Sequence, residues 1–466
     1  MTTEYEVRAT PYRSTDPATG ATVHTVEATS EDEVSALLER ADAGFRAWRA
    51  TPVEQRAAVV AAVGALFAER APELARLAAL EMGKPVAEGE GEVQFCGSIF
   101  GYYAQEGPAL CEDVPLHDGG AARTVVPRRP VGAVLGIMPW NFPYYQVARF
   151  VAPNLLLGNA VVVKHAESVP ACAEAIQQVM DDAGVPPGVY TTVFASHEQV
   201  ARIIADDRVQ GVSLTGSERA GAAVAAIAGA HLTKCVLELG GSDPYVVLDS
   251  ADVAATAADA WGTRMYNVGQ ACNSNKRIIV HDELHDELVD HLVALASAST
   301  PASPSDARAV GHAPMASRAG AQELAAQVAD AVAQGAVLHV GGDVADDGSA
   351  YFAPAVLTGV HPGMRAYDEE LFGPVLVVHR VSSDDEAVAL ANDSVYGLGA
   401  AVFSTDDERA ARVADRLEVG MARINCADAG GPAVPVGGIK RSGFGRELGA
   451  LGLDEFANRR VVSTGS

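Results

Sequence analysis

The spacing of apolar residues predicts helices in the N-terminal part of the chain. Ser30-Glu31-Asp32-Glu33 has the form of a capping box, and the apolar residues after it recur at helical spacing, at Val34, Leu37, Leu38, Ala41, Phe45 and Trp48. This pattern predicts an amphipathic helix. A stretch rich in alanine and leucine, from Arg56 to Leu80, predicts one further helical segment that ends near Gly83-Lys84-Pro85.

From residue 131 onward, short apolar runs alternate with helix-like segments. The first strand candidates are Val131–Met138, Ala160–Val163, Val189–Phe194 and Gly211–Leu214, and the helix candidates among them are Ala171–Ala183 and Glu218–Gly229. A second alternating series begins at Val236–Leu237 and continues through Tyr245–Leu248, Arg277–His281, Ala336–Val340 and Val375–Val378. Such alternation is typical of a parallel sheet wrapped by helices. We therefore predict an α/β fold with two lobes that join near Glu238.

Composition and charge narrow the classes of partner. The chain has 466 residues, of which 48% are hydrophobic and 20% charged, as expected of a compact protein. Its net charge of −26 would repel nucleic acids and anionic membrane surfaces alike. The longest apolar run, from Ala57 to Ala68, is too short to cross a bilayer, and the N-terminus has no signal-peptide pattern. We expect a cytoplasmic protein with no nucleic-acid or membrane partner.

One cysteine has an unusual setting. The six cysteines, at positions 96, 111, 172, 235, 272 and 426, show no spacing typical of a zinc site or a redox pair, so we expect free thiols and no metal. Cys272 lies between Gly269-Gln270-Ala271 and the polar run Asn273-Ser274-Asn275. A free cysteine is more often a small buried hydrophobe, so taken alone Cys272 is only a candidate nucleophile.

Two further groups have both a catalytic and a structural interpretation. Glu238 lies in an apolar stretch that ends in two glycines, and burial would raise its pKa toward the range of a general base, although a salt-bridged structural carboxylate explains it equally well. Asn141, flanked by two aromatic residues and two prolines, is held rigidly enough to donate to an oxyanion. A turn asparagine that bonds its own backbone is the usual alternative.

The sequence offers one site for a dinucleotide phosphate and one unsuitable glycine motif. The glycines from Gly443 to Gly449 are spaced one residue too widely for the usual fingerprint and follow no clear strand. The run from Val212 to Ser217 leads from an apolar strand into a helix and would present free N–H groups to a phosphate, although an ordinary N-cap explains it as well. Lys164 and Glu167 follow another strand, where ligands of open α/β sheets bind.

Seven stretches, taken in order, resemble the motif series of the NAD(P)-dependent aldehyde dehydrogenase superfamily across nearly the whole chain. They are MPWNFP (138–143), LTGSERAG (214–221), LELGGSDP (237–244), GQACNSNKR (269–277), EELFGPV (369–375), NDSVYGLGAAVF (392–403) and PVGGIKRSGFGRELG (435–449). Each stretch alone is a weak signal, whereas the ordered series is specific. The stretches KHAES (164–168), KCVLELGGSDP (234–244) and EMGKP (81–85) are most similar to bacterial succinate-semialdehyde dehydrogenases of the shorter type.

The resemblance implies an aldehyde-dehydrogenase-like fold in three parts. These are a variant Rossmann coenzyme domain (1–111 and 131–238), an α/β catalytic domain (239–436) and a small β oligomerisation element (112–130 and 437–466). Such an element implies a homodimer or a homotetramer.

The resemblance also implies the roles of single residues. It makes Cys272 the nucleophile, Glu238 the general base and Asn141 the oxyanion donor, and it would let Glu447 carry a proton away, although a salt bridge fits Glu447 equally. It places the coenzyme on Met138, Trp140, Lys164, Glu167, Gly216, Ser217, Glu370 and Phe372. A carboxylate at 167 would accept hydrogen bonds from a free ribose 2′-hydroxyl and repel a 2′-phosphate, so NAD is favoured over NADP.

The resemblance favours succinate semialdehyde as the substrate, oxidised to its acid through a cysteine-bound thioester. Arg149 matches an arginine that binds the substrate carboxylate in succinate-semialdehyde dehydrogenases, and Phe142 and Tyr266 are further substrate-side candidates. Two departures keep another short aldehyde open as the alternative, because better-known members have an arginine where this chain has Tyr266 and a serine where it has Gly430-Gly431. A coenzyme-A-acylating enzyme or a catalytically silent homologue fits less well, since the chain retains a candidate base, nucleophile and oxyanion donor. The stretch AVGHAPMAS (309–317) resembles a lengthened family turn and receives no function.

Overall fold

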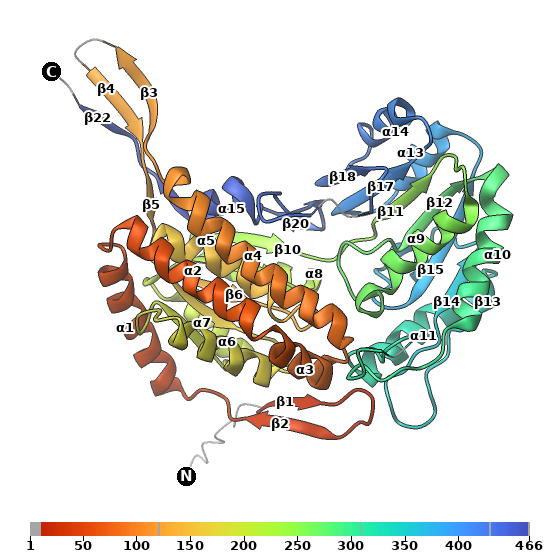
Figure 1. Ribbon diagram of the computed structural model, residues 1–466, viewed down its shortest axis with the longest axis horizontal. Helices are drawn as coiled ribbons and strands as arrows, with labels where there is room; N and C mark the ends of the chain where they lie inside the picture. Colours follow the sequence, from red (N-terminus) through yellow and green to blue (C-terminus); the bar gives the residue numbers. More distant parts are fainter. Residues whose placement is uncertain (1–10, 120–121, 309, 428–429, 465–466) are drawn as a thin grey trace.

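The computed structural model describes residues 11–119, 122–308, 310–427 and 430–464. It consists of two lobes and a projecting β arm (Figure 1). In these described ranges, no helix is both long enough and apolar enough to span a membrane.

The first lobe is built on a six-stranded sheet in the order β20-β10-β9-β6-β7-β8. Five strands are parallel: β6 (Ala133–Ile137), β7 (Ala160–Lys164), β8 (Tyr190–Val193), β9 (Val209–Thr215) and β10 (Lys234–Glu238). Strand β20 (Gly443–Phe444) pairs antiparallel to β10 at the edge. Alternate residues of β7 enter different cores, Val161 and Val163 on one face and Ala160 and Val162 on the other, so both faces of the sheet are covered.

Helices cover the two faces of this sheet. One face packs mainly against α2 (Val53–Glu69), α3 (Ala71–Met82), α4 (Val86–Leu110), α5 (Tyr145–Leu157) and α6 (Pro170–Asp182). The other face packs against α1 (Glu31–Trp48), α7 (His197–Ala205) and α8 (Glu218–Ala230). The hairpin of β1 (Tyr12–Thr15) and β2 (Thr22–Val26) lies at the bottom of this lobe in Figure 1. The arrangement confirms the α/β prediction for this part of the chain.

Two predictions about the N-terminal helices had different outcomes. The capping box is confirmed, because the Ser30 side chain accepts from the Glu33 N–H and the Ser30 N–H donates to the Glu33 carboxylate at 2.8 Å. The prediction of one helical segment from Arg56 to Leu80 is wrong, since α2 ends at Glu69 and α3 begins at Ala71. Pro72 has no N–H for the preceding helical turn, so the helix stops and a new one starts there.

The second lobe is built on a seven-stranded sheet in the order β13-β14-β15-β12-β11-β17-β18. The strands are β11 (Pro244–Val247), β12 (Arg277–His281), β13 (Val337–Val340), β14 (Ala355–Thr358), β15 (Val375–Val381), β17 (Gly399–Phe403) and β18 (Met421–Ile424). All neighbours are parallel except β13 with β14. The helical segments of this lobe are α9 (Val253–Met265), η1 (Tyr266–Gly269), α10 (Asp282–Ala298), α11 (Arg318–Ala333), α12 (Arg365–Asp368), α13 (Asp384–Asn392) and α14 (Asp407–Ala414).

The boundary between the two strand series differs from the prediction. The series of the second sheet was predicted to begin at Val236–Leu237, but these residues belong to β10, which pairs with β9 in the first sheet. The second sheet begins one strand later, at β11. A short apolar run shows that a strand is present but not which neighbour it pairs with, so the sequence pattern could not resolve this.

The chain after residue 437 is divided between the body and the arm. The arm consists of β3 (Val114–Gly119), β4 (Ala122–Val126) and β22 (Val462–Thr464), in the order β22-β4-β3, and it projects from the first lobe (Figure 1). At its base β5 (Arg128–Pro130) pairs with β21 (Ala457–Arg459). By contrast, β20 and α15 (Gly449–Glu455) pack on the first lobe, and β19 (Ile439–Lys440) pairs with β16 (Tyr396–Gly397). The arm is therefore smaller than the predicted oligomerisation element.

Candidate active site

The parallel strands of the first sheet end at one common edge, and several candidate residues follow them there. Thr215 ends β9 and Glu238 ends β10, in register with each other. Met138 and Trp140 follow β6, and Lys164 ends β7. Open α/β sheets bind their ligands at this edge, so the fold collects these residues where a ligand would bind.

The loop before Cys272 has an unusual backbone. Asn267, Val268 and Gly269 all have positive φ, at 50°, 56° and 73°. A β-branched residue such as Val268 is strained in this region, and such strain persists only where the surroundings impose it. A Cβ on Gly269 would lie 2.4 Å from the Gly373 carbonyl oxygen, so only glycine fits there. The loop is therefore held in one conformation by its neighbours.

Hydrogen bonds from three other segments hold this loop. The Asn267 N–H donates to the Glu88 carboxylate of α4 at 2.7 Å, and the Asn267 amide donates to the Asn141 carbonyl at 2.9 Å. The Ala316 N–H donates to Gln270 Oε1 at 2.9 Å. Ala316 belongs to the stretch 309–317, to which the sequence analysis assigned no function, and this stretch therefore helps to hold the loop before Cys272. Ala309 itself lies outside the described residues. These contacts position the cysteine from both lobes.

Asn141 lies against the same loop. Its amide nitrogen donates to the Gln270 carbonyl at 2.9 Å, and the residue is buried. The segment after it is anchored by Glu92, which accepts from the Tyr144 and Tyr145 N–H groups at 2.9 Å each and forms a buried ion pair with Lys84. The sequence analysis missed these two ionic residues; the EMGKP stretch was noted only for its family likeness.

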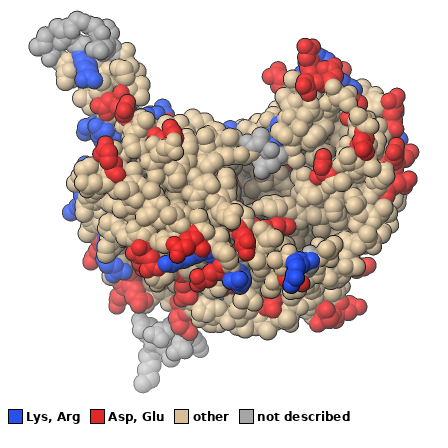
Figure 2. Space-filling view, in the orientation of Figure 1, with Lys and Arg blue, Asp and Glu red and all other residues tan. Residues whose placement is uncertain are grey.

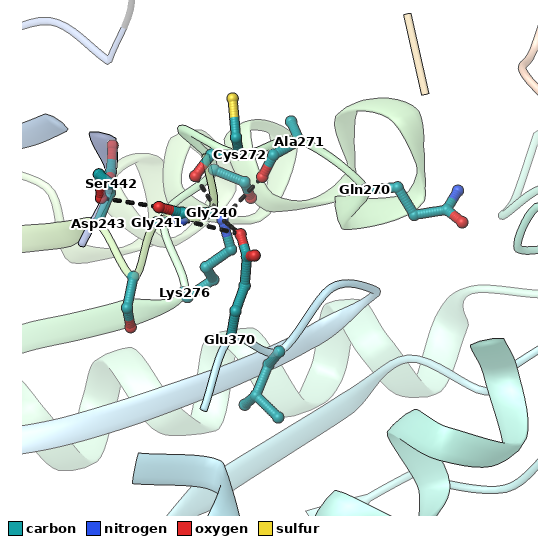
Figure 3. Close-up of polar contacts among 12 residues, drawn as sticks. Gly240, Gly241, Asp243, Gln270, Ala271, Cys272, Lys276, Glu370 and Ser442 are labelled. Atoms are coloured by element: carbon teal, nitrogen blue, oxygen red, sulfur yellow. Dashed lines mark hydrogen bonds and ion pairs between the residues drawn. The ribbon is translucent and has the colours of Figure 1, made fainter. Parts of the chain in front are cut away.

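The Cys272 thiol has an environment that opposes ionisation. Burial raises its pKa to about 11, the positive charges of Arg149 and Lys276 lower it, and the carboxylates of Glu370 and Glu238 raise it. At neutral pH this site holds the thiol rather than the thiolate. In Figure 3 the sulfur points away from the Lys276 and Glu370 side chains. A base must therefore take the thiol proton before the sulfur can act as a nucleophile.

Glu238 has the properties of such a base. It is 3% exposed, and its Oε1 has no hydrogen-bond partner among the described residues. Burial raises its pKa to about 8, Arg149 works in the opposite direction, and Glu447 adds to the increase. A Cβ on Gly437 would lie 2.8 Å from Oε1, so glycine leaves this oxygen free of a side chain above it. A pKa near neutrality suits proton transfer in either direction.

Glu447 and Arg149 form a buried ion pair. Arg149 also donates to Thr215 Oγ1 at 3.0 Å, and Glu447 accepts from Ser213 Oγ at 2.9 Å. Burial is the largest single effect and lowers the pKa of Arg149, but Glu447 and the other acidic groups around it together outweigh burial, so the pKa of Arg149 is raised. The structure thus has the salt bridge that the sequence left open for Glu447, and its partner is the arginine predicted to bind the substrate.

Several of the predicted coenzyme residues lie at or near the strand ends of the first sheet. Ser217 caps α8 by accepting from the Ala220 N–H, and a Cβ on Gly216 would meet only Leu214 at 3.6 Å, so the helix N-terminus is accessible to a phosphate. Lys164 Nζ lies 3.6 Å from Glu167 Oε1, and burial lowers the pKa of Lys164. The rings of Trp140 and Phe372 meet edge to face with centroids 5.7 Å apart.

Lys276 connects a predicted coenzyme residue to the candidate nucleophile. Its ammonium donates to the Ala271 and Cys272 carbonyls at 2.7 and 2.6 Å and pairs with Glu370 at 2.9 Å (Figure 3). The Gly241 N–H also donates to Glu370, at 3.1 Å. The sequence analysis missed Lys276. One sequence feature could have identified it: Lys276 is a lysine four residues after Cys272, at the start of a buried strand, where a cation requires partners.

A cavity of about 630 Å³ opens at Cys272. Its described lining includes the predicted substrate residues Phe142, Tyr266 and Arg149 as well as Arg423, which the sequence analysis did not consider. The rings of Phe142 and Tyr266 lie with centroids 5.8 Å apart. Asn141 and Glu238 are not in that lining. The Asn141 amide donates to the Gln270 carbonyl in the loop before Cys272, and Glu238 interacts electrostatically with Arg149, which does line the cavity. Figure 2 shows the surface hollowed between the lobes.

Comparisons with known proteins agree on one family. The model of the aldehyde dehydrogenase family matches residues 5–462. The chain is 50% identical over 455 residues to a succinate-semialdehyde dehydrogenase [NADP(+)] of Deinococcus radiodurans, which covers 97% of this chain and 94% of the relative. It is 42% identical to a succinate semialdehyde dehydrogenase [NAD(P)+] of Escherichia coli, with 97% and 98% covered. The crystal structure of succinic semialdehyde dehydrogenase from Streptococcus pyogenes in complex with NADP+ superposes with a TM-score of 0.94 at 36% identity, covering 98% of this chain and all of the other.

Proposed function

Because the chain belongs to the aldehyde dehydrogenase family, oxidoreductases that act on aldehydes, we propose that it oxidises succinate semialdehyde to succinate. The observation that carries the proposal is the cavity that opens at Cys272, whose lining includes two arginines, Arg149 (paired with Glu447) and Arg423, in a chain of net charge −26. Cations in such a cavity favour an anionic aldehyde over a neutral one. The names of relatives that are 42–50% identical support the same substrate.

The described residues suffice for acyl transfer through a cysteine. Glu238 takes the thiol proton of Cys272, and the sulfur then forms a bond to the aldehyde carbon. The oxyanion is stabilised by the Asn141 amide and the Cys272 N–H. A bound nicotinamide dinucleotide supplies the hydride acceptor of the oxidation. Glu238 passes the first proton to solvent and then deprotonates a water that attacks the thioester, so the C–S bond breaks, the acid is released and Glu238 returns this second proton to the sulfur of Cys272.

The proposed coenzyme site is the strand edge with Lys164, Glu167 and the N-terminus of α8. Glu167 alone favours NAD, as predicted from the sequence, because a carboxylate repels a 2′-phosphate. Lys164 Nζ lies 3.6 Å from it, however, and offers a cation to the same phosphate. The two relatives described above are named for NADP(+) and NAD(P)+. We propose that the enzyme accepts both coenzymes, and that Glu167→Gln shifts kcat/KM toward NADP.

The reaction is tested by following coenzyme reduction at 340 nm with succinate semialdehyde and with butanal. We expect succinate semialdehyde to be preferred by about 10-fold or more in kcat/KM, because the neutral aldehyde lacks a charge-assisted contact. Cys272→Ala should abolish the signal. Equal rates with both aldehydes would reject the substrate, and the absence of turnover with any aldehyde would reject the mechanism. Release of free acid without coenzyme A separates hydrolysis from acylation of a thiol.

We propose that the arm joins two copies of the chain. Strand β3 is an edge strand, with unpaired backbone groups along its outer side, and Val114 and Leu116 on it are 44% and 65% exposed. A strand from a second copy would satisfy the backbone and cover these side chains. Light scattering should give a dimer or a tetramer for the native chain and a lower mass for Leu116→Asp. A native mass equal to one chain would reject the proposal.

A further inference from the structure

The proposed substrate has a carboxylate at its far end, and the arginine predicted to bind it is already paired. Arg149 contacts Glu447 and Thr215, so its guanidinium is occupied on two sides inside the protein. An ion pair of this kind is neutral as a unit and attracts an incoming anion weakly. The cavity needs another cation if it is to select a carboxylate.

Arg423 is a second arginine in the lining of that cavity. It lies on β18, the edge strand of the second sheet, opposite Ala401 of β17. Within the described part of the chain its half-buried side chain has no ion pair and no hydrogen bond, unlike that of Arg149. A guanidinium that is partly removed from water and forms no ion pair is an incomplete site for a carboxylate.

Gly399 and Asp243 lie next to the Arg423 side chain, and Asp243 does not form an ion pair with it. A Cβ on Gly399 would lie 3.5 Å from Arg423 Nη1 and 2.4 Å from Asp243 Oδ2, so glycine at this position leaves room for both groups. Asp243 Oδ2 is buried and has no hydrogen-bond partner among the described residues. Burial raises the pKa of Asp243 to about 7, and Lys276 counteracts this more than Arg423 does. Asp243 is therefore near Arg423 but does not form an ion pair with it.

The lining around Arg423 has space for a carboxylate. Ala422, Gly430 and Gly431 line the same cavity and carry at most a methyl group. A Cβ on Gly431 would meet only Val434, at 3.8 Å. This is the region in which the sequence has two glycines instead of a serine, so these described residues contribute little side-chain volume and no hydroxyl of their own.

We propose that Arg423 binds the distal carboxylate of the substrate while Cys272 reacts with the aldehyde carbon at the other end of the cavity. The inference rests on the proposed function, a semialdehyde that carries a carboxylate. It assigns Arg423 to substrate selection and Arg149 to the ion pair with Glu447. Arg423 thus replaces Arg149 as the expected determinant of specificity.

The test compares Arg423→Gln with the native enzyme on succinate semialdehyde and butanal. We expect kcat/KM for succinate semialdehyde to fall by about 10- to 100-fold, mainly through KM, because a charge-assisted contact is lost. The value for butanal should stay within about twofold. Arg423→Lys keeps the charge without the planar fork and should retain an intermediate preference. Arg412→Gln, an exposed arginine on α14 of the same lobe, is the matched control and should change neither substrate.

A second measurement uses the enzyme without coenzyme. Succinate should slow the alkylation of Cys272 by iodoacetamide in the native protein, and butanoate should slow it less, because it has no second carboxylate at the far end. Arg423→Gln should abolish the difference between the two acids. Retained protection by succinate in this variant would overturn the assignment.

The outcomes separate the two claims. If the native enzyme prefers succinate semialdehyde and Arg423→Gln keeps that preference, the substrate stands and Arg423 is not its partner. If the native enzyme shows no preference, the substrate proposal fails and the assignment fails with it. Turnover of butanal shows that the glutamine variant has folded; should it not fold, Arg423→Lys carries the same test, with an expected loss of about threefold to tenfold.

Discussion

Replacing Glu238 by glutamine should stabilise the protein while it stops the reaction. The pKa of Glu238 is raised by burial from 4.5 to about 8. As pH rises through 4.5 the unfolded chain loses this proton, whereas the folded chain keeps it until about pH 8. The unfolded state then binds fewer protons than the folded state, so the free energy of unfolding falls across this interval and is constant above it. Glutamine resembles the neutral carboxyl and removes this dependence.

The size of the effect follows from the two pKa values. At pH 7 the raised pKa lowers the free energy of unfolding by ~3 kcal/mol, because each pH unit above 4.5 contributes about 1.4 kcal/mol. For 466 residues the unfolding entropy is on the order of 1 kcal/mol per degree, so the Tm of Glu238→Gln should rise by about 3 °C at pH 7. At pH 4.5 the gain should be close to zero. Glu198→Gln, an exposed glutamate on α7, is the matched control and should not change the Tm.

The assay is thermal unfolding of the three proteins at pH 5, 7 and 8.5, combined with acid release. Glu238→Gln should reduce acid production by about 10²- to 10⁴-fold, because water attacks the thioester without a base. A Tm that is unchanged or lower at pH 7, or a gain that is equally large at pH 5, would refute the claim that burial raises the pKa of this carboxyl. Unchanged acid release would refute its role as the base.

Three other predictions concern the nucleophile and its neighbours. Alkylation of Cys272 by iodoacetamide should accelerate by about tenfold per pH unit from pH 7 to 10, because burial raises the pKa of this thiol to about 11; a plateau near pH 8 would contradict this. Lys276→Met should slow alkylation at every pH in that range, since the lysine charge lowers the thiol pKa, whereas Lys234→Met, at an exposed ion pair with Glu455, should have no effect. Asn141→Ala should lower kcat by about 10²- to 10³-fold, as measured by coenzyme reduction, and should lower the Tm by only about 1–3 °C, because one buried hydrogen bond to Gln270 is lost; a change confined to KM would argue against an oxyanion role.

The sequence was sufficient for those parts of the fold that depend on local pattern. Strand β7 was predicted from Ala160–Val163 because its residues pack on both faces and form one continuous apolar run. The Ser30 cap was predicted because its hydrogen bonds span only three residues. The break at Arg70 was missed because apolar spacing continues through it, although Pro72 was the available signal.

The contacts that define the site are long-range, and local pattern does not contain them. Arg149 and Glu447 are 298 residues apart in sequence, so nothing near either one indicated the ion pair. Arg423 lies on a strand whose neighbours could not be predicted, and its position at the cavity depends on the path of β18 beside β17. The family resemblance identified Cys272, Glu238 and Asn141 as candidates, but it did not show that Lys276 holds the Cys272 carbonyl.

The pairing of β20 with β10 has a consequence for biosynthesis. Glu238 is aligned with Gly443, and Gly437 lies over its carboxylate, so a segment that packs on this acid is synthesised well after the acid itself. A nascent chain that has not reached this segment lacks these contacts with Glu238. The surroundings of this candidate base are therefore completed only after Gly443 is made, and a chain that stops before Gly437 keeps both Cys272 and Glu238 but lacks the glycine over the acid.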